Sequence, residues 1–159
     1  MSRKEGSRSR EAAVPDKAER VRTMLYTAAA VVAGLGVAET IYLTAMHLAG
    51  AHITCVASGG CSQVLSSKHA IIAGIPVAAF GLAGYFTAFS AATLSAFRFP
   101  LAEKLFTAVV IMMFLATLWF LYLQAFVIRS FCDYCLLSAA MTFALTAIVV
   151  LLPSKRTAV

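Results

Sequence analysis

Charge is what this sequence has least of. Only 13% of its 159 residues are Asp, Glu, Lys or Arg, whereas 61% are hydrophobic and the mean hydropathy is +0.86. Two long apolar stretches, 76–97 and 105–128, contain no charged residue at all. Because soluble domains carry about 25% charged and about 45–50% apolar residues, this composition excludes an ordinary soluble domain. It indicates an integral membrane protein.

Cofactor-binding motifs are also lacking. The sequence has no haem-attachment pattern, no glycine-rich nucleotide fingerprint and no flavin motif. It shows no internal repeat of fixed period. The net charge of +6 comes from Lys and Arg at the chain ends and in connections, so membrane topology explains it better than nucleic-acid binding does.

Four apolar runs are long enough to cross a bilayer, at about 24–49, 76–97, 105–128 and 132–152. A span takes about 20 residues, and backbone groups in lipid must pair within the segment, so each run is expected to be a helix. The sequence therefore predicts an all-α integral membrane protein, a four-helix bundle over 23–153. A disordered or loosely helical basic tail, 1–22, precedes it and a short tail, 154–159, follows. The long loop 50–75 is the natural place for function. Its mildly amphipathic stretch, QVLSSKHAII, is expected to lie along the membrane surface.

The distribution of Lys and Arg predicts the orientation. Seven lie in residues 1–22, two between the second and third runs and two after the fourth, against one in each of the other two connections. Eleven against two is a strong positive-inside bias. Both termini are therefore expected in the cytoplasm, with all four cysteines on the outer face of the membrane. In a bacterium this is the periplasmic or extracytoplasmic side of the cell inner membrane and in a eukaryote the ER lumen, and disulfides persist in both.

The cysteines form two closely spaced pairs. Cys132 and Cys135 open the last apolar run, where the helix dipole favours a thiolate and the C-x-x-C spacing allows an easily reduced disulfide. Cys55 and Cys61 enclose five residues, VASGG, in the long connection, within reach of another protein. Two dithiols on one face suggest a thiol-disulfide relay. Its electrons would leave Cys135 for a lipid-soluble acceptor, and a quinone fits.

Other readings of the cysteines stay open. Zinc binding is one, although C-x5-C with C-x2-C is an atypical ligand pattern, and no metal is expected. Two structural disulfides in a non-enzymatic four-span protein are another, although a C-x-x-C bridge within one helical turn constrains little. Glu39 lies deep in the first run, where carboxylates are costly and usually face the bundle interior. It is either a proton donor or hydrogen-bonding group near the quinone, or else an interhelical hydrogen-bonding group or a protonated residue without a catalytic role.

Two stretches carry a family resemblance. The segment 55–85, C-VASGG-C-SQVLSSKHAIIAGIPVAAFGLAGY, and the segment 131–135, FCDYC, resemble the bacterial branch of the vitamin K epoxide reductase family. The resemblance implies a disulfide-bond-forming enzyme that oxidises the dithiol of a separate thioredoxin-like protein and reduces a quinone.

The resemblance also implies roles for single residues. Cys55 would react with the partner protein, Cys61 would form a transient disulfide with Cys132, and Cys135 would reduce the quinone. The resemblance also implies a short half-helix in the outer loop, which carries Ser66 and Ser67 and covers the pocket. The implied pocket residues are Ser67, Val77, Phe80, Phe114 and Ala139.

Two of these pocket positions depart from the animal enzymes of the family. Val77 and Ala139 stand where those enzymes carry an Asn and a Tyr that hydrogen-bond the naphthoquinone. The absence of this Asn and this Tyr points to ubiquinone or menaquinone as the oxidant. Reduction of vitamin K quinone or its epoxide is the alternative.

Overall fold

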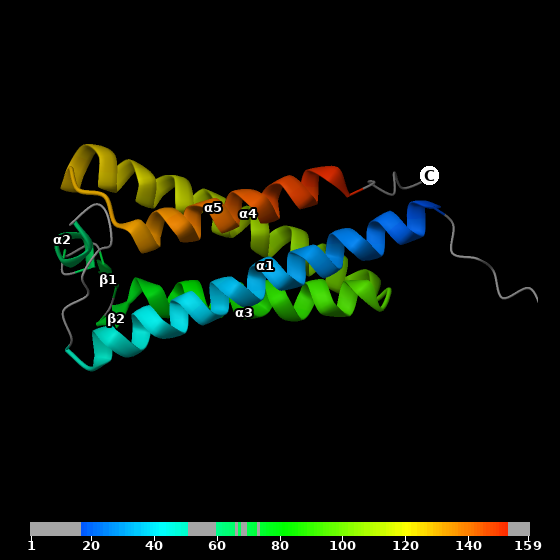
Figure 1. Cartoon of the computed structure of the whole chain (residues 1–159), viewed down its shortest axis with the longest axis horizontal. Helices are drawn as coiled ribbons and strands as arrows, with labels where there is room; N and C mark the ends of the chain where they lie inside the picture. Colours follow the sequence, from blue (N-terminus) through cyan, green and yellow to red (C-terminus); the bar gives the residue numbers. More distant parts are fainter. Residues whose placement is uncertain (1–16, 51–59, 66, 68–69, 73, 153–159) are drawn as a thin grey trace, which may run out of the picture.

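The computed structural model describes residues 17–50, 60–65, 67, 70–72 and 74–152. Four long helices run side by side along the molecule: α1 (Lys17–Leu48), α3 (Val77–Ala96), α4 (Pro100–Tyr122) and α5 (Asp133–Leu151) (Figure 1). The chain continues from α4 into a short π-helical segment, η2 (Leu123–Ile128). All four helices are long and apolar enough to cross a membrane. The predicted all-α four-helix bundle is confirmed.

Short elements gather at one end of the bundle (Figure 1). They are helix α2 (Cys61–Leu65) and strands β1 (Ile71–Ile72) and β2 (Ile75–Pro76), which pair antiparallel. We call this the cysteine end, because Cys61 in α2 and the start of α5 lie there. The short helix between the first two spans is confirmed. It ends at Leu65, and the chain turns through Gly74 at φ +83° to pair the two strands, a hairpin that the sequence did not predict.

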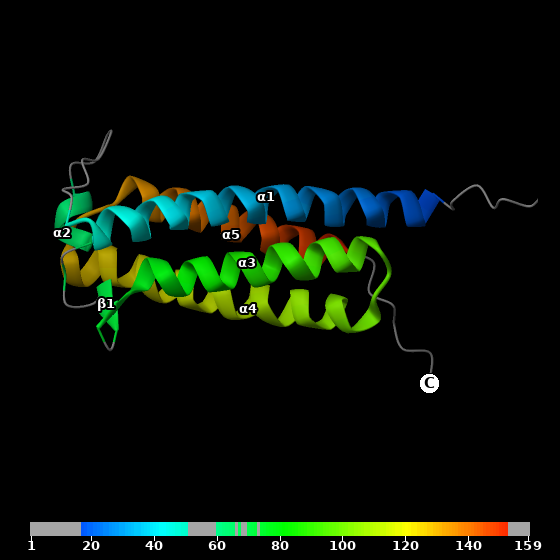
Figure 2. The ribbon, with the colours of Figure 1, turned by 90° about the horizontal axis from the view of Figure 1, so that it is seen from below.

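Helix α1 packs chiefly against α3, and α3 packs against α4 (Figure 2). Small buried residues make the first contact close: Ala33 on α1 and Ala88 on α3 are fully buried. A β-carbon at Gly36 would lie 2.4 Å from the ring of Tyr85. Small residues let membrane helices approach closely, so glycine at position 36 is what brings Tyr85 against α1.

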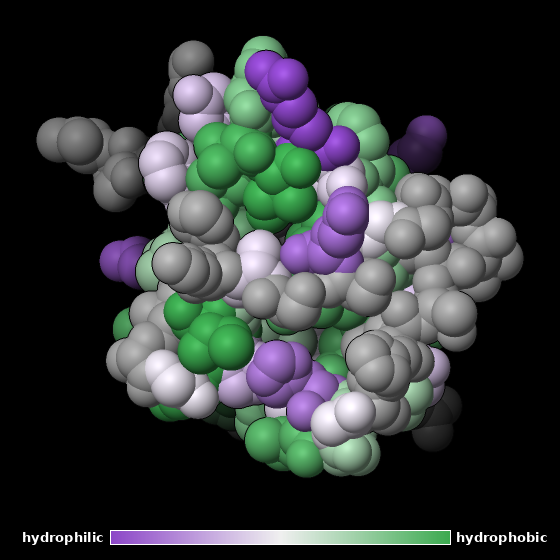
Figure 3. All heavy atoms as spheres, turned by 90° about the vertical axis from the view of Figure 1, so that its left-hand side faces the viewer, coloured by the Kyte–Doolittle hydropathy of each residue, from purple (hydrophilic) through white to green (hydrophobic). Residues whose placement is uncertain are grey.

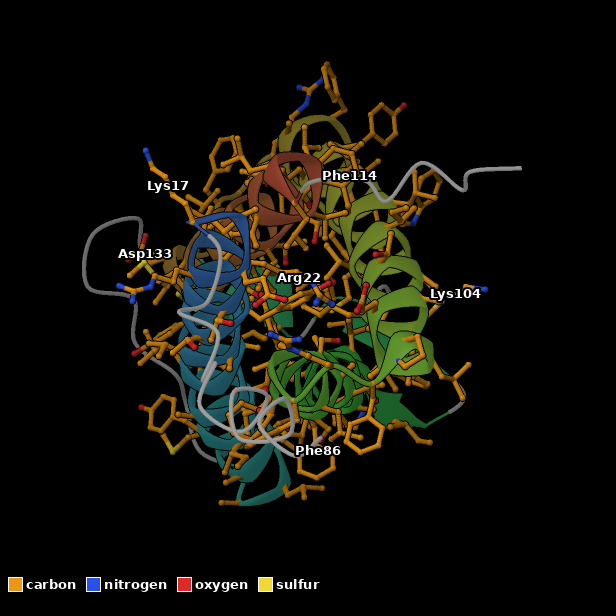
Figure 4. All side chains as sticks on the ribbon, turned by 90° about the vertical axis from the view of Figure 1, so that its right-hand side faces the viewer. Lys17, Arg22, Phe86, Lys104, Phe114 and Asp133 are labelled. Carbon is orange, nitrogen blue, oxygen red and sulfur yellow. The ribbon has the colours of Figure 1, made fainter. Side chains whose placement is uncertain are left out.

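Ion pairs join the helices at the opposite end. Arg22 of α1 pairs with Glu103 of α4, and Arg98 pairs with Glu19 at 2.8 Å. Figure 4 looks at this end and shows Arg22 pointing inward between the helices, whereas Lys17 and Lys104 point outward.

These pairs explain two helix boundaries. Helix α1 begins at Lys17, inside the stretch 1–22 that we expected to be a disordered or loosely helical tail, and α4 begins at Pro100 rather than at 105. The added residues are mostly good helix formers, proline suits a first helical turn, and charges from distant parts of the chain fasten both extensions. Residues 1–16 and 153–159 lie outside the described residues.

Candidate functional site

Three of the four cysteines lie in the described part of the chain, and all three are at the cysteine end. Cys61 is the first residue of α2, Cys132 precedes α5, and Cys135 lies in its first turn. Cys61 and Cys132 are completely buried and belong to one apolar cluster with Leu43. The fold thus places a sulfur from the long connection beside the dithiol of the last span. Cys55, the fourth predicted site cysteine, lies outside the described residues.

A close backbone contact holds α2 against the start of α5. A β-carbon at Gly60 would lie 2.6 Å from the carbonyl oxygen of Phe131 and 3.2 Å from Cβ of Ser130. Ser130 also donates a hydrogen bond from its hydroxyl to Oε1 of Gln63. Glycine before Cys61 therefore lets α2 dock on the residues that precede Cys132.

The sulfurs differ in redox state. Cys61 is disulfide-bonded, whereas Cys132 and Cys135 are free thiols. Neither thiol of α5 is therefore the partner of Cys61 in this state. The α5 pair is reduced and can give up electrons.

Gln124 fixes the backbone at Cys132. Its side chain is buried, and its Oε1 accepts a hydrogen bond of 3.1 Å from the Cys132 N–H. It lies in η2, and π-helical turns occur frequently at functional sites. Arg129, with φ +53°, then turns the chain toward α5. Gln124 was missed in the sequence analysis. The available signal was that it is the one side-chain amide in the apolar run 105–128, because polar side chains in membrane spans usually face the bundle interior and often have a function.

Hydrogen bonds decide the ionisation of Cys132. The Cys135 thiol donates to its sulfur and, with the backbone N–H groups of Cys135 and Tyr134, lowers the pKa of Cys132 from 9.0 to about 7. Burial and the negative charge of Asp133 act in the other direction. The sequence predicted a thiolate-favouring helix start, which the negative charge of Asp133 opposes. Donors outweigh it because they contact the sulfur directly.

This pKa predicts a pH dependence. In a protein whose loop cysteines are replaced by serine, the thiolate absorbance of Cys132 should disappear as pH falls through about 7. In Cys135→Ala the midpoint should rise toward the ordinary 9.0, because the main hydrogen-bond donor is gone. A pH titration of the ultraviolet thiolate band measures both. An unchanged midpoint in the variant would contradict this account of the ionisation.

A cavity of about 490 Å³ opens beside Cys135. Its wall is mostly apolar and comes from α1, α2, α3, α4, η2 and α5, with members such as Leu43, Val64, Ala78 and Leu121. This volume lies within the range of about 300–1,000 Å³ that small-molecule sites occupy. Among the described cysteines, Cys135 alone lines it. An apolar molecule in the cavity would therefore meet the Cys135 side of the dithiol.

Four of the five predicted pocket residues line this cavity: Ser67, Val77, Phe80 and Ala139. Phe114, the fifth, is not among the lining residues. Its ring packs edge to face on Phe143, with centroids 5.6 Å apart. The side chain at 114 thus points to α5 and not into the cavity.

A polar group that the sequence analysis missed also lines the cavity. The hydroxyl of Tyr85, a nearly fully buried residue, hydrogen-bonds Oγ of Ser138 at 2.9 Å, Oγ1 of Thr142 at 3.0 Å and the carbonyl oxygen of Ser138 at 2.7 Å. Ser138 and Thr142 are four residues apart on α5, the spacing that puts two side chains on one helix face. That spacing was the available signal. The trio supplies hydrogen-bonding groups to an otherwise apolar wall.

Glu39 lies near the dithiol but not in the cavity wall. Both of its carboxylate oxygens are buried, and no described residue donates a hydrogen bond to them. It interacts electrostatically with Cys132, Cys135 and Tyr85. The structure thus brings together the intramembrane carboxylate and the α5 thiols.

Free thiols at the edge of an apolar cavity, inside a bundle of membrane-spanning helices, are features of a membrane thiol oxidoreductase. Residues 27–150 match the vitamin K epoxide reductase family. Because this match covers most of the chain, the protein belongs to that family. Enzymes of the family are quinone-reducing oxidoreductases that work with thiols.

Proposed function

We propose that this protein oxidises the dithiol of a separate thioredoxin-like protein, reduces a quinone and so supports disulfide-bond formation. In the net reaction the partner's two thiols lose two electrons and two protons and form one disulfide. The quinone gains both electrons and both protons and becomes a quinol. The observation that carries the proposal is the position of the α5 pair: Cys132 is clustered with Cys61, whereas Cys135 faces the cavity.

The proposed relay has three exchanges. The partner thiol attacks Cys55, which breaks the disulfide of the loop pair. The partner's second thiol then closes the partner's own disulfide and leaves both loop cysteines reduced. The Cys61 thiolate attacks Cys132 of an oxidised α5 pair and releases Cys135, and Cys55 next attacks Cys61 in this transient Cys61–Cys132 disulfide, which re-forms the loop disulfide and leaves the α5 pair reduced. The α5 dithiol finally gives two electrons to the quinone and closes the Cys132–Cys135 disulfide again. The shared burial of Cys61 and Cys132 and the lowered pKa of Cys132 support the middle step.

We propose that the cysteine end faces the periplasmic or extracytoplasmic side of a bacterial inner membrane and that both termini are cytoplasmic. The Lys and Arg bias of the sequence supports this orientation. Figure 3 shows that the cysteine end presents hydrophilic residues among hydrophobic ones, as suits a face that meets a water-soluble partner. The other end carries Arg22 and Lys104 (Figure 4).

We propose ubiquinone or menaquinone as the acceptor, with Ser67, Val77, Phe80 and Ala139 in its wall. The apolar character of the lining supports a long-chain quinone. Phe114 would act from outside this wall, behind Phe143.

Quinol formation by purified protein tests the function. Protein in detergent is given a soluble quinone analogue and a dithiol donor, and quinone absorbance is followed against the Cys132→Ala, Cys135→Ala double variant as chemical background. We expect one quinol for each donor disulfide and no reduction of vitamin K epoxide in a parallel sample. A rate equal to that of the double variant would refute the proposal. Reduction of the epoxide as fast as the quinone would favour the vitamin K cycle.

A further inference from the structure

Glu39 is a buried carboxylate that packing does not explain. One interpretation of the sequence was that Glu39 forms an interhelical hydrogen bond. No described residue donates a hydrogen bond to either of its carboxylate oxygens, so the structure does not support that interpretation. A carboxyl group in the interior of a membrane bundle costs free energy, and more when it lacks a partner. Such a group persists where it serves a reaction, as is frequent for intramembrane carboxylates that move protons.

The neighbours of Glu39 are groups that exchange protons. In the described part of the chain, the titratable groups that interact electrostatically with it are Cys132 and Cys135 at the start of α5 and Tyr85 on α3. The adjoining segment η2, LQAFVI, contributes no titratable side chain. The carboxylate therefore lies within electrostatic range of both the dithiol and Tyr85.

Tyr85 connects this carboxylate to the cavity. Its ring lies against Gly36, one helical turn before Glu39. Its hydroxyl bonds to Ser138 and Thr142, and all three residues line the cavity. Because Glu39 itself does not line the cavity, a proton that leaves it for the quinone would pass through the Tyr85 hydroxyl.

We propose that Glu39 carries the proton of the reduced α5 dithiol to the quinone site by way of Tyr85. This inference rests on the proposed function. Near neutral pH the pair holds one thiolate, Cys132, and one thiol, Cys135, hydrogen-bonded to it. Oxidation joins the sulfurs and sends two electrons to the quinone. The Cys135 proton moves to the Glu39 carboxylate and then to a quinone oxygen, and water at the cysteine end supplies the second proton of the quinol.

Single-turnover kinetics with Glu39→Gln test this role. Protein with a pre-reduced α5 pair is mixed with a soluble quinone analogue over a range of pH. We expect Glu39→Gln to slow quinone reduction by about 100-fold, the usual contribution of a positioned proton carrier. Glu39→Asp and Tyr85→Phe should each slow it by about tenfold, since each keeps part of the path.

The pH profile separates a proton carrier from a structural residue. The wild-type rate requires two ionised groups, Glu39 and Cys132, so its logarithm should fall by about two per pH unit at low pH, and by about one in Glu39→Gln. The melting temperature of Glu39→Gln should be equal to or above that of wild type, because an unpartnered buried carboxyl destabilises the fold. Ser95→Ala, which removes a buried hydroxyl near the far end of α3, is the matched control and should keep full activity.

The outcomes distinguish this inference from the proposed function. If wild-type protein reduces no quinone, the proposed function itself fails. If wild type is active and Glu39→Gln matches it in rate and in pH slope, the function stands and the proton path is refuted. A Glu39→Gln protein that is slow but melts well below wild type, with an unchanged pH slope, would also refute it, because the carboxyl would then be structural.

Discussion

Replacement of Cys135 by alanine is expected to reduce quinone turnover to the uncatalysed background and to trap a disulfide between Cys61 and Cys132. Cys135 is the one described cysteine in the cavity wall, so without it no thiol there passes electrons to the quinone. In this variant the Cys132 thiolate attacks Cys61 of the loop disulfide and Cys55 leaves as a thiolate. With no thiol at position 135 to displace Cys61 from Cys132, the new bond stays intact. Turnover assays and disulfide mapping by mass spectrometry after exposure to a dithiol measure both effects.

Two further variants control this experiment. Cys132→Ala should also abolish turnover but cannot form the Cys61 link, so it shows that the trapped species is specific. Ser138→Ala changes a neighbour of Cys135 but keeps the thiols of Cys132 and Cys135. The Cys61–Cys132 disulfide should therefore not accumulate in this variant. If Cys135→Ala never contains a Cys61–Cys132 bond, the relay through Cys132 is wrong, even where turnover is lost.

The second large effect is expected from Gly60→Ala. A methyl group there would lie 2.6 Å from the Phe131 carbonyl oxygen, a distance that real β-carbons do not show. Backbone must move on one side or the other, and α2 then shifts away from Cys132. A displacement of about 1 Å between reacting groups can lower a rate by about 100-fold. We expect electron transfer from the loop pair to the α5 pair to slow by about that factor.

The design isolates that one step. Gly60→Ala protein with a pre-reduced α5 pair should reduce quinone at the wild-type rate, because the cavity and Cys135 are unaffected. Gly34→Ala is the matched control: its new methyl would lie 3.7 Å from the Phe89 ring, an ordinary contact, so both steps should be normal. Transfer from Cys61 at the wild-type rate in Gly60→Ala would show that close docking of α2 is not required.

Several features follow from the sequence because they depend on local chemistry. A run of about 20 apolar residues must be a helix in lipid, so the second span, expected at 76–97, is Val77–Ala96 and the fourth, expected at 132–152, is Asp133–Leu151. Cys135 follows Cys132 by less than one helical turn, so their proximity was also predictable. Both cysteines lie at a helix start, where the positive end of the helix dipole favours a thiolate, so this part of the environment was predictable too.

Other features depend on the rotational orientation of each helix, that is, on which of its faces points into the bundle. The spans are apolar on nearly every side, so the pattern of their residues marks no inward face. Phe114 was therefore expected in the pocket but contacts Phe143, whereas Gln124 and Tyr85 were overlooked and line the cavity. The early start of α1 at Lys17 depends on Glu103, a residue far away in the chain.

The sequence by itself determined the class of this protein, its four spans and its dithiol chemistry, because hydrophobic length and cysteine spacing act over a few residues. Tertiary structure alone decided that Cys61 meets Cys132, that Cys135 faces the cavity and that Glu39 is buried without a partner. Those relations arise from the close packing of helices, in which glycines at 36 and 60 set how near the segments approach. Contacts between distant segments leave no periodic signal along the chain.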